Sequence, residues 1–422
     1  MEFLVKKGVL VDPAAGRFGE FDLKVENGRV IEVGRGLSTK GEIVNAKDKY
    51  VFPGAIDMHV HFREPGEEYK ETILTGSKAA AHGGVTTVLC MPNTKPPCDD
   101  ETKISYVMEI AKRADIRVFQ AGSITKGHEG KEISPFGRMK RAGAIAVSDD
   151  GNPIFNSLVM RRALEYAKTF SLVLIDHCED KNLSDGGYIN EGVLSLKTGI
   201  KGIPSAAEEI FVARDIILAS FVGYPIHTTH ISTMGSINLI RDAKNRKLPV
   251  DCDVAIHHFT FTEEDVRITD TSFKVNPPIR SKADRDAIRE AISDGYVDCI
   301  ISDHAPHSDI EKDTDPLSAS FGISSLDFFL PLCYSLVIDG VIDVSKLVSL
   351  ISFNPSKILK IKGVGTLKEG SFADFVIFDQ DEEEVITVDN IFSKGKNCPY
   401  LNKKVRGKVK ATYVNGKKVY GV

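Results

Sequence analysis

Short apolar runs and amphipathic segments alternate through the middle of the chain. Eight runs are predicted to be strands: 55–62, 86–93, 116–123, 144–151, 172–179, 225–232, 250–258 and 298–304. The segments between them have helical periodicity and helix-capping residues, among them 70–84, 157–170, 205–223 and 282–295. Eight strand–helix units over roughly 250 residues predict an α/β fold, a TIM-like (β/α)8 barrel. A doubly wound open sheet is the alternative, but no glycine-rich dinucleotide motif follows the first predicted strand.

Both ends of the chain have a different pattern, in which apolar and polar residues alternate. Segments 21–34 and 407–420 each contain an Asn-Gly pair, at Asn27-Gly28 and Asn415-Gly416. Asn-Gly between alternating segments predicts a β-hairpin, because a type I′ turn needs positive φ at both central residues. We therefore predict a small β-sandwich domain formed by both termini, from residues 1–52 and 361–422, with the barrel at 53–360 between its halves.

Composition narrows the class of protein. Of the 422 residues, 42% are hydrophobic and 27% are charged, as in ordinary globular chains, and the net charge of -5 gives no reason to expect a nucleic-acid partner. No apolar run approaches the ~20 residues of a membrane span, and the N-terminus lacks the pattern of a secretory signal. The seven cysteines include no CxxC pair, which argues against a disulfide scaffold or a thiolate zinc site. We expect buried free thiols and a cytoplasmic protein without a membrane partner.

Metal-ligand residues gather where the predicted strands end. They are His59, His61, Asp150, His177, His230 and Asp303, and they come from five of the eight strands. The carboxyl ends of barrel strands form the site in this fold, and residues two apart on a strand share a face. A single histidine is more commonly structural, but the joint pattern predicts a metal site. Six ligands exceed one tetrahedral zinc, so two metals that share a bridging carboxylate fit better.

Asp149 and Asp150 are adjacent, and only one can point into the barrel. Ile145 and Val147 share a face with Asp149, whereas Ala146 and Ser148 share a face with Asp150. We expect the bulky pair to face the helices, which favours Asp150 as the ligand.

Several motifs closely resemble those of the dihydroorotases of the amidohydrolase superfamily, and the bacterial type I branch in particular. They are DMHVHFREPG (57–66), MPNTKP (91–96), SDDG (148–151), HCED (177–180), VNPPIR (275–280) and SDHAPH (302–307). In addition, GTLKEGSFADFVIFD (365–379) resembles the segment that returns from barrel to β domain in that superfamily. The resemblance covers essentially the whole chain and implies a metal-dependent barrel beside a small β domain.

The resemblance also implies a role for each ligand. His59, His61 and Asp303 would bind one Zn²⁺, and His177 and His230 would bind a second. Asp150 would bridge the two ions; many relatives use a carbamylated lysine there, but this chain has none at that position.

The same resemblance implies a set of substrate-binding residues: His61, Arg63, Asn93, Asn276, His307 and the backbone at Phe321-Gly322. Arg63, Asn93 and His307 would hold a carboxylate of the substrate, and Asn276 and Phe321-Gly322 would contact its ring. Each has a structural alternative. Arg63 could pair with Glu64 or Glu67, Asn93 could cap a helix or turn, His307 could be structural, and Asn276-Pro277-Pro278 could be only a rigid loop.

The implied activity is the reversible cyclisation of N-carbamoyl-L-aspartate to L-dihydroorotate, with Asp303 as the group that transfers the proton. The alternatives are another cyclic amidohydrolase, such as a dihydropyrimidinase, hydantoinase or allantoinase, and a non-catalytic subunit of an aspartate transcarbamoylase complex. A homodimer and an association with aspartate transcarbamoylase are the partner hypotheses. Segments 182–208 and 307–322 are the candidate loops beside the substrate.

Overall fold

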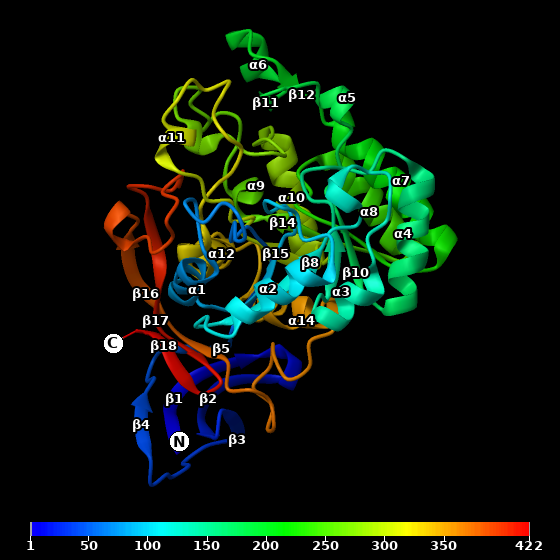
Figure 1. Ribbon diagram of the computed structural model, residues 1–422. Coiled ribbons are helices and arrows are strands. Elements are labelled where there is room, and N and C mark those ends of the chain that lie inside the picture. Colours follow the sequence, from blue (N-terminus) through cyan, green and yellow to red (C-terminus); the bar gives the residue numbers. More distant parts are fainter. Residues whose placement is uncertain (1, 422) are drawn as a thin grey trace.

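The computed structural model describes residues 2–421, whose middle part forms a closed parallel barrel (Figure 1). Its strands are β6 (Ala55–Val60), β7 (Val85–Cys90), β8 (Arg117–Gly122), β9 (Ala146–Ser148), β10 (Val173–Asp176), β13 (Ile226–Thr228), β14 (Val250–Ala255) and β15 (Cys299–Ile301). Each strand pairs with the next one in this order. A parallel bridge between Val60 and His304 joins the last strand to the first, and the His61 amide donates to the His304 carbonyl at 2.8 Å. The predicted barrel is therefore confirmed, and the alternative, a doubly wound open sheet, is wrong.

The observed strands are shorter than the predicted runs, and every candidate ligand except His59, which is in β6, lies just beyond a strand end. β9 ends at Ser148 and β15 ends at Ile301. Arg63, His230 and Asp303 have positive φ angles of 59°, 41° and 47°. The chain turns sharply at these positions, which places their side chains over the barrel mouth.

Helices surround the barrel and supply its outer apolar layer. The principal ones are α1 (Ile73–His82), α2 (Glu101–Ala111), α3 (Phe136–Ala142), α4 (Ser157–Phe170), α7 (Ala206–Val222), α8 (Met234–Asn245), α10 (Lys282–Asp294) and α12 (Phe329–Ile338); shorter ones are α5 (Lys181–Ser184), α6 (Val193–Thr198), α9 (Ile256–Thr260), α11 (Asp309–Lys312), α13 (Val344–Val348) and α14 (Asn354–Ile358). Alternate strand residues face opposite layers, as the pleat requires: Val88 packs in the cluster shared with the helices and Leu89 in the barrel interior.

The two termini form a second sheet, as predicted. Its strands are β1 (Glu2–Asp12), β2 (Arg17–Glu26), β3 (Arg29–Gly34), β4 (Glu42–Asn45), β5 (Tyr50–Pro53), β16 (Phe375–Val385), β17 (Lys404–Val414) and β18 (Lys417–Gly421). They are joined by hydrogen bonds into one sheet of order β18-β17-β16-β5-β1-β2-β3, with β4 beside β1, rather than into two separate sheets. Both Asn-Gly turns are confirmed, with φ angles of 50° and 77° at Asn27-Gly28 and of 51° and 70° at Asn415-Gly416.

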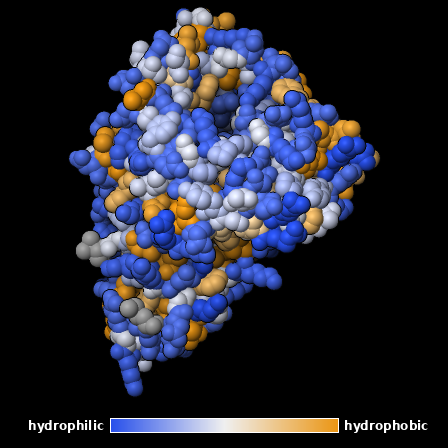
Figure 2. Space-filling model, in the orientation of Figure 1, coloured by the Kyte–Doolittle hydropathy of each residue, from blue (hydrophilic) through white to orange (hydrophobic). Residues whose placement is uncertain are grey.

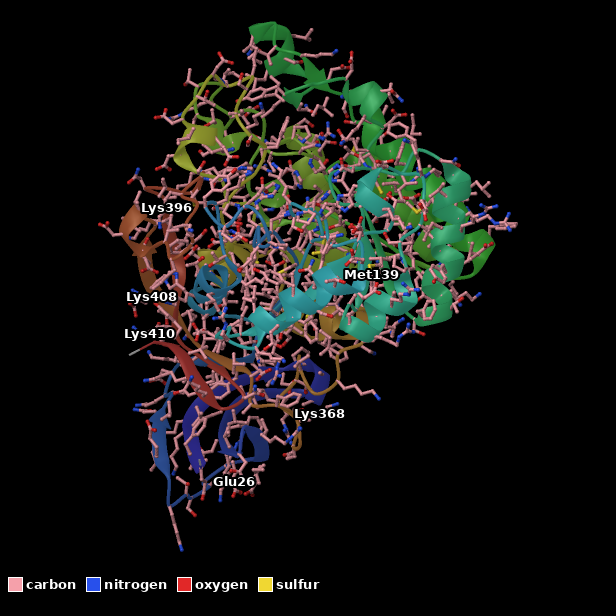
Figure 3. The ribbon with its side chains drawn as sticks, in the orientation of Figure 1. Glu26, Met139, Lys368, Lys396, Lys408 and Lys410 are labelled. Carbon is pink, nitrogen blue, oxygen red and sulfur yellow. The ribbon has the colours of Figure 1, made fainter. Side chains whose placement is uncertain are left out.

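The terminal sheet is fastened to the barrel. Arg117 at the start of β8 pairs with Asp374 at 2.7 Å, and the Thr412 hydroxyl donates to the Ala81 carbonyl at 2.6 Å. Within the sheet, Lys408 and Lys410 project from β17 and pair with Glu382 of β16 (Figure 3). The connection between β16 and β17 reaches back to the barrel mouth, where Asn397 accepts a hydrogen bond from the His307 amide at 3.0 Å.

One long connection projects from the barrel. It contains α5, α6 and a two-stranded sheet of β11 (Ile189–Asn190) and β12 (Gly202–Ile203), and it lies at the top of Figure 1. The visible surface is mostly hydrophilic, with hydrophobic residues in small groups (Figure 2). None of the helices between residues 2 and 421 is long and apolar enough to cross a membrane. All seven cysteines are buried and free, as expected.

Candidate functional site

A cavity of about 420 Å³ opens at the carboxyl ends of the barrel strands. Its lining contains every residue that the sequence predicts for the site except His59 and His307. His59 lies beneath the cavity and His307 lies behind Arg63, with contacts described below. Side chains from distant parts of the chain thus meet in one place.

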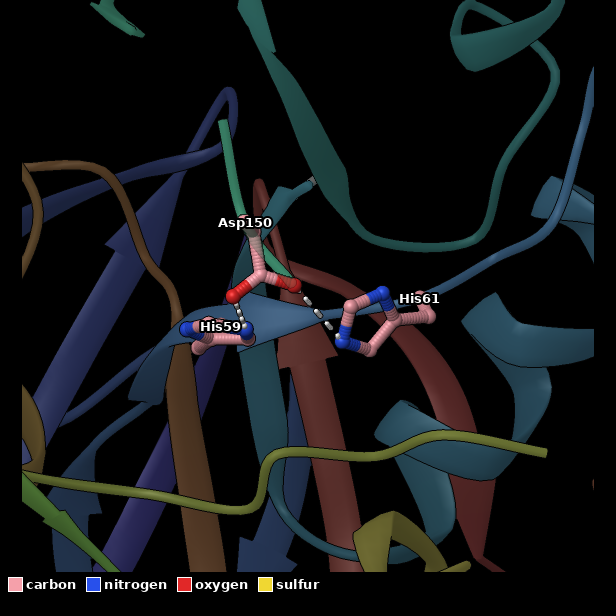
Figure 4. A group of neighbouring side chains, drawn as sticks. All are labelled: His59, His61 and Asp150. Carbon is pink, nitrogen blue, oxygen red and sulfur yellow. Dashed lines mark ion pairs between the residues drawn. The ribbon is translucent and has the colours of Figure 1, made fainter. Parts of the chain in front are cut away.

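Asp150 lies between two pairs of histidines. One of its carboxylate oxygens, Oδ1, is 3.4 Å from His59 Nε2, and the other, Oδ2, is 3.6 Å from His61 Nε2 (Figure 4). Oδ1 is also 3.7 Å from His177 Nδ1 and 3.7 Å from His230 Nε2. A single carboxylate therefore contacts both pairs, as a bridging ligand would.

Asp303 approaches only the first pair closely. Its Oδ1 is 3.3 Å from His61 Nε2 and 3.6 Å from His59 Nε2. Burial by itself raises the pKa of Asp303, but the hydrogen bond to His61 and the neighbouring imidazoles outweigh it and hold that pKa well below its usual range. Asp303 is thus ionised and able to accept a proton.

The outward-facing nitrogens of three histidines are held by oxygen atoms. His59 Nδ1 is 2.9 Å from Thr229 Oγ1, His61 Nδ1 is 2.9 Å from Asn93 Oδ1, and His177 Nε2 is 2.9 Å from Glu179 Oε2. Such contacts fix the orientation and the tautomer of an imidazole. They leave Nε2 of His59 and His61 directed toward Asp150, while His177 Nδ1 lies 2.9 Å from His230 Nε2 and 3.7 Å from Asp150 Oδ1.

Asp253 organises the base of this cluster. It is buried and accepts hydrogen bonds from the Thr229 hydroxyl at 3.1 Å and from the His230 amide at 2.5 Å. Because the Thr229 hydroxyl donates to Asp253, its oxygen must accept the proton of His59 Nδ1. In the neutral imidazole, Nε2 then carries the lone pair and faces Asp150, which is the tautomer a metal ligand needs.

The donor set fits a metal cation. His59 Nε2 and Asp150 Oδ1 are buried and have no hydrogen-bond partner among residues 2–421, whereas buried polar atoms normally have one. Burial lowers the pKa of His59, but Asp150 and then Asp303 outweigh it and raise that pKa to about 9, so their field favours a positive charge here. Around Asp150, the ligand atoms of His59–His61–Asp150 lie within 4.8 Å of one another, and so do those of Asp150–His177–His230.

The two adjacent aspartates take different places. Asp149 points away from the cavity. Its Oδ1 accepts hydrogen bonds from the backbone amides of Ile124 at 2.8 Å and Thr125 at 3.0 Å. Val147 packs toward the helices, as predicted, but Ile145 packs against the interior cluster, so the expectation for that residue is wrong. Ile145 precedes β9, and the alternation that holds within a strand does not extend to it.

Arg63 is a buried cation at the edge of the cavity. Its Nε donates to the Pro306 carbonyl at 3.1 Å, and one terminal nitrogen is 3.2 Å from His307 Nε2. The alternative surface ion pair is wrong, because Arg63 is only 9% exposed, while Glu67 pairs with Lys70 at 2.9 Å and Glu64 accepts the Ile73 amide at 2.9 Å. Burial and the adjacent guanidinium lower the pKa of His307 to about 3, so its imidazole is neutral.

Asn93 and Asn276 both face the cavity. Asn93 donates to Asp150 Oδ2 at 3.0 Å and is not a helix cap, since α2 is capped by Asp100. Asn276 donates to Glu179 Oε2 at 3.1 Å. Glu179 was not among the residues predicted from the sequence, although its position two residues after His177 was a usable signal. Hydrogen bonding to His177 outweighs burial and lowers the pKa of Glu179 to about 2.

Comparison with known proteins gives full-length relatives. Residues 48–236 match a family model described as dihydro-orotase-like, and residues 229–420 match one described as the amidohydrolase family. A dihydroorotase of Pelotomaculum thermopropionicum is 46% identical over 99% of this chain and 98% of its own length. A dihydroorotase of Geobacter metallireducens is 46% identical over the whole of both chains.

Solved structures share the architecture at lower identity. An L-hydantoinase from Arthrobacter aurescens has a TM-score of 0.88 at 23% identity and covers 99% of this chain and 96% of its own. A dihydropyrimidinase from Brevibacillus agri has a TM-score of 0.86 at 20% identity, with 100% and 95% covered. At such identities the likeness concerns the fold.

Proposed function

Because the chain belongs to the dihydroorotase family of the amidohydrolases, we propose that it catalyses the reversible cyclisation of N-carbamoyl-L-aspartate to L-dihydroorotate in pyrimidine biosynthesis. It is a metal-dependent cyclic amide hydrolase by family. The observation that carries the specific substrate is the buried guanidinium of Arg63 beside the Asp150 cluster, because it offers a fixed cation to a carboxylate substrate. A neutral dihydropyrimidine has no carboxylate for that group to bind.

We assign the metal-binding roles as the resemblance implies. His59, His61 and Asp303 would hold one Zn²⁺, His177 and His230 a second, and Asp150 both. When bound, the ions would lower the pKa of a water molecule and polarise the amide carbonyl of the substrate. The bonds from Thr229, Asn93 and Glu179 to three of these histidines support the assignment, because each keeps a nitrogen directed at Asp150.

Asp303 moves the proton in this proposal. In the hydrolytic direction its carboxylate accepts a proton from the attacking water and donates it to the ring nitrogen as the amide bond breaks. The low pKa of Asp303 supports the first part of this role, since the group is ionised before reaction. In the cyclisation direction the same group takes the proton from the ureido nitrogen and delivers it to the hydroxide that leaves the protonated carboxyl group, which departs as water.

Arg63, Asn93 and His307 would bind the carboxylate that remains ionised in both substrates. The guanidinium is oriented by the Pro306 carbonyl before substrate arrives, which reduces the entropy lost on binding. His61, Asn276 and the backbone of Phe321-Gly322 complete the proposed substrate contacts, and all of them line the cavity.

Replacement of Arg63 by alanine should raise KM for L-dihydroorotate about 10- to 100-fold, because a charge-assisted hydrogen bond contributes roughly 1.5–3 kcal/mol. Steady-state kinetics on both substrates would measure the effect. Arg63→Lys keeps the charge but not the planar fork, and it should recover only part of the loss. An unchanged KM in Arg63→Ala would remove this residue from the binding site.

The proposal as a whole is tested by turnover of L-dihydroorotate and N-carbamoyl-L-aspartate, with the metal content determined on the same sample. Turnover with about two zinc ions per chain, a number that suits six ligands sharing one bridge, would support it. Turnover of dihydrouracil, hydantoin or allantoin in place of dihydroorotate would identify another cyclic amidohydrolase. Neither metal nor turnover, even with added zinc, would favour the non-catalytic subunit of an aspartate transcarbamoylase complex. We further propose that the enzyme is cytoplasmic and forms a homodimer. Sedimentation of the purified enzyme would test the dimer, and fractionation of the cell would test the location.

A further inference from the structure

A buried lysine lies under the loop that follows the last barrel strand. We propose that Lys312 is a positioning residue, which fastens the two segments that face the substrate ring, 320–322 and 274–276, to each other. The inference rests on the proposed function for the identity of the substrate. It assigns a role to a residue that does not line the cavity and that no motif of the sequence includes.

The ammonium group of Lys312 is bound by backbone carbonyls. Its Nζ donates to the carbonyls of Ser320 at 2.8 Å, Gly322 at 3.0 Å and Lys274 at 3.4 Å. An ammonium has three N–H donors, and each therefore has an acceptor. Lys312 is only 7% exposed and has no carboxylate within ion-pair distance in residues 2–421. Burying a charge without a counter-ion is costly, so the arrangement persists only with this full set of acceptors.

The carbonyls belong to two separate parts of the site. Gly322 and Phe321 end the loop after β15, and Lys274 is two residues before Asn276. The Gly322 amide also donates to the Lys274 carbonyl at 2.8 Å, so the two segments touch directly above the amine. Gly322 has a φ of 152°, and a side chain there would meet the Ala305 carbonyl at 2.5 Å, so this approach requires glycine.

Lys274 strengthens the same junction from the other side. Its Nζ donates to the carbonyls of Pro316 and Leu317, both at 2.9 Å, and lies 4.6 Å from the ring centres of Tyr188 and Phe321. Tyr188 comes from the long projecting connection. Two lysines thus connect the loop after β15 to both neighbouring segments through polar and cation–π contacts.

The charge of Lys312 is sensitive to pH. Burial first, and then the nearby Lys274, lower its pKa to about 7, against the opposing effects of Asp270 and Glu311. Below that pH the amine carries three protons and satisfies three carbonyls. Above it, one proton is lost and a lone pair faces a carbonyl, so the junction weakens. Affinity for the substrate should therefore fall as the pH rises through about 7.

Lys312→Met should raise KM for L-dihydroorotate about tenfold, since hydrogen bonds to a charged group are lost, and should change kcat less. Lys312→Arg should restore most of the affinity and remove the rise of KM above pH 7, because arginine stays charged. Lys244→Met is the control at the opposite end of the barrel. Lys244 also donates to a backbone carbonyl, that of Tyr296 at 2.7 Å, and in addition it pairs with Asp298.

Hydrogen exchange gives a readout that does not depend on the substrate. The backbone amides of residues 313–322 should exchange faster in Lys312→Met than in the wild type. In Lys244→Met their exchange rates should equal those of the wild type. Unchanged KM and unchanged exchange in Lys312→Met, or a fall in kcat alone, would overturn the inference. If Lys312→Met does not fold, a wild-type rise of KM that persists in Lys312→Arg would overturn it. If the wild-type enzyme does not act on dihydroorotate, the proposed function is contradicted. The hydrogen-exchange data would then be the only test of the positioning role of Lys312.

Discussion

Asp303→Asn should lower kcat about 10²- to 10⁴-fold, because asparagine cannot accept and return the proton that a positioned acid or base transfers in the reaction. The change is nearly isosteric and leaves an oxygen beside His61 Nε2, which is 3.3 Å from Asp303 Oδ1 in the wild type. We therefore expect KM to change far less than kcat. Steady-state kinetics in both directions, with the metal content measured in parallel, would separate the loss of proton transfer from a loss of metal.

Asp298→Asn is the matched control. Asp298 lies just before β15, at the opposite end of the strand from Asp303, and accepts the Cys252 amide at 2.8 Å. Its substitution should affect stability but not turnover. Near-normal turnover in Asp303→Asn would exclude Asp303 as the group that transfers the proton.

Asp150→Asn should cost at least about 100-fold in metal affinity, since loss of even a hydrogen-bond partner of a metal ligand typically costs about 10- to 100-fold. The physical reason is that both histidine pairs face this one carboxylate, at 3.4–3.7 Å. Activity should fall with it. Metal content after dialysis against a chelator, together with turnover, would measure the effect.

The neighbouring aspartate provides the control on the same loop. Asp149→Asn should keep the metal but destabilise the fold by about 1–3 kcal/mol, because the buried amides of Ile124 and Thr125 lose their acceptor. Thermal unfolding of the two variants would show the difference. If Asp149→Asn loses the metal and Asp150→Asn retains it, the roles of the two residues are reversed.

The fold was accessible from the sequence because its signals are local. Apolar runs, helical periodicity and the two Asn-Gly pairs each span a few residues, and the barrel and both hairpins follow from them. The ends of the strands were less accessible. Within the predicted run 144–151, only Ala146–Ser148 forms a strand, β9. A strand ends where its hydrogen bonds to the neighbouring strand end. That position depends on the neighbouring strand, which lies elsewhere in the sequence.

The site was predictable as a set of residues but not as a network. His59 and His61 were identifiable from their place at a strand end. Asp253, in contrast, is connected to His59 through Thr229, which is 170 residues away from His59. Likewise, Glu179 meets Asn276 and Lys312 meets the Lys274 carbonyl only when distant segments come together.

The barrel, the terminal β domain and the kinds of side chain at the barrel mouth could all be predicted from the sequence, since each depends on residues close together along the chain. The folded chain was needed to show which aspartate faces the histidines, which atoms orient His59 and His61, and how Lys312 joins two loops. The physical reason is that these features are contacts between segments tens to hundreds of residues apart, and their geometry exists only after the strands have closed into a ring.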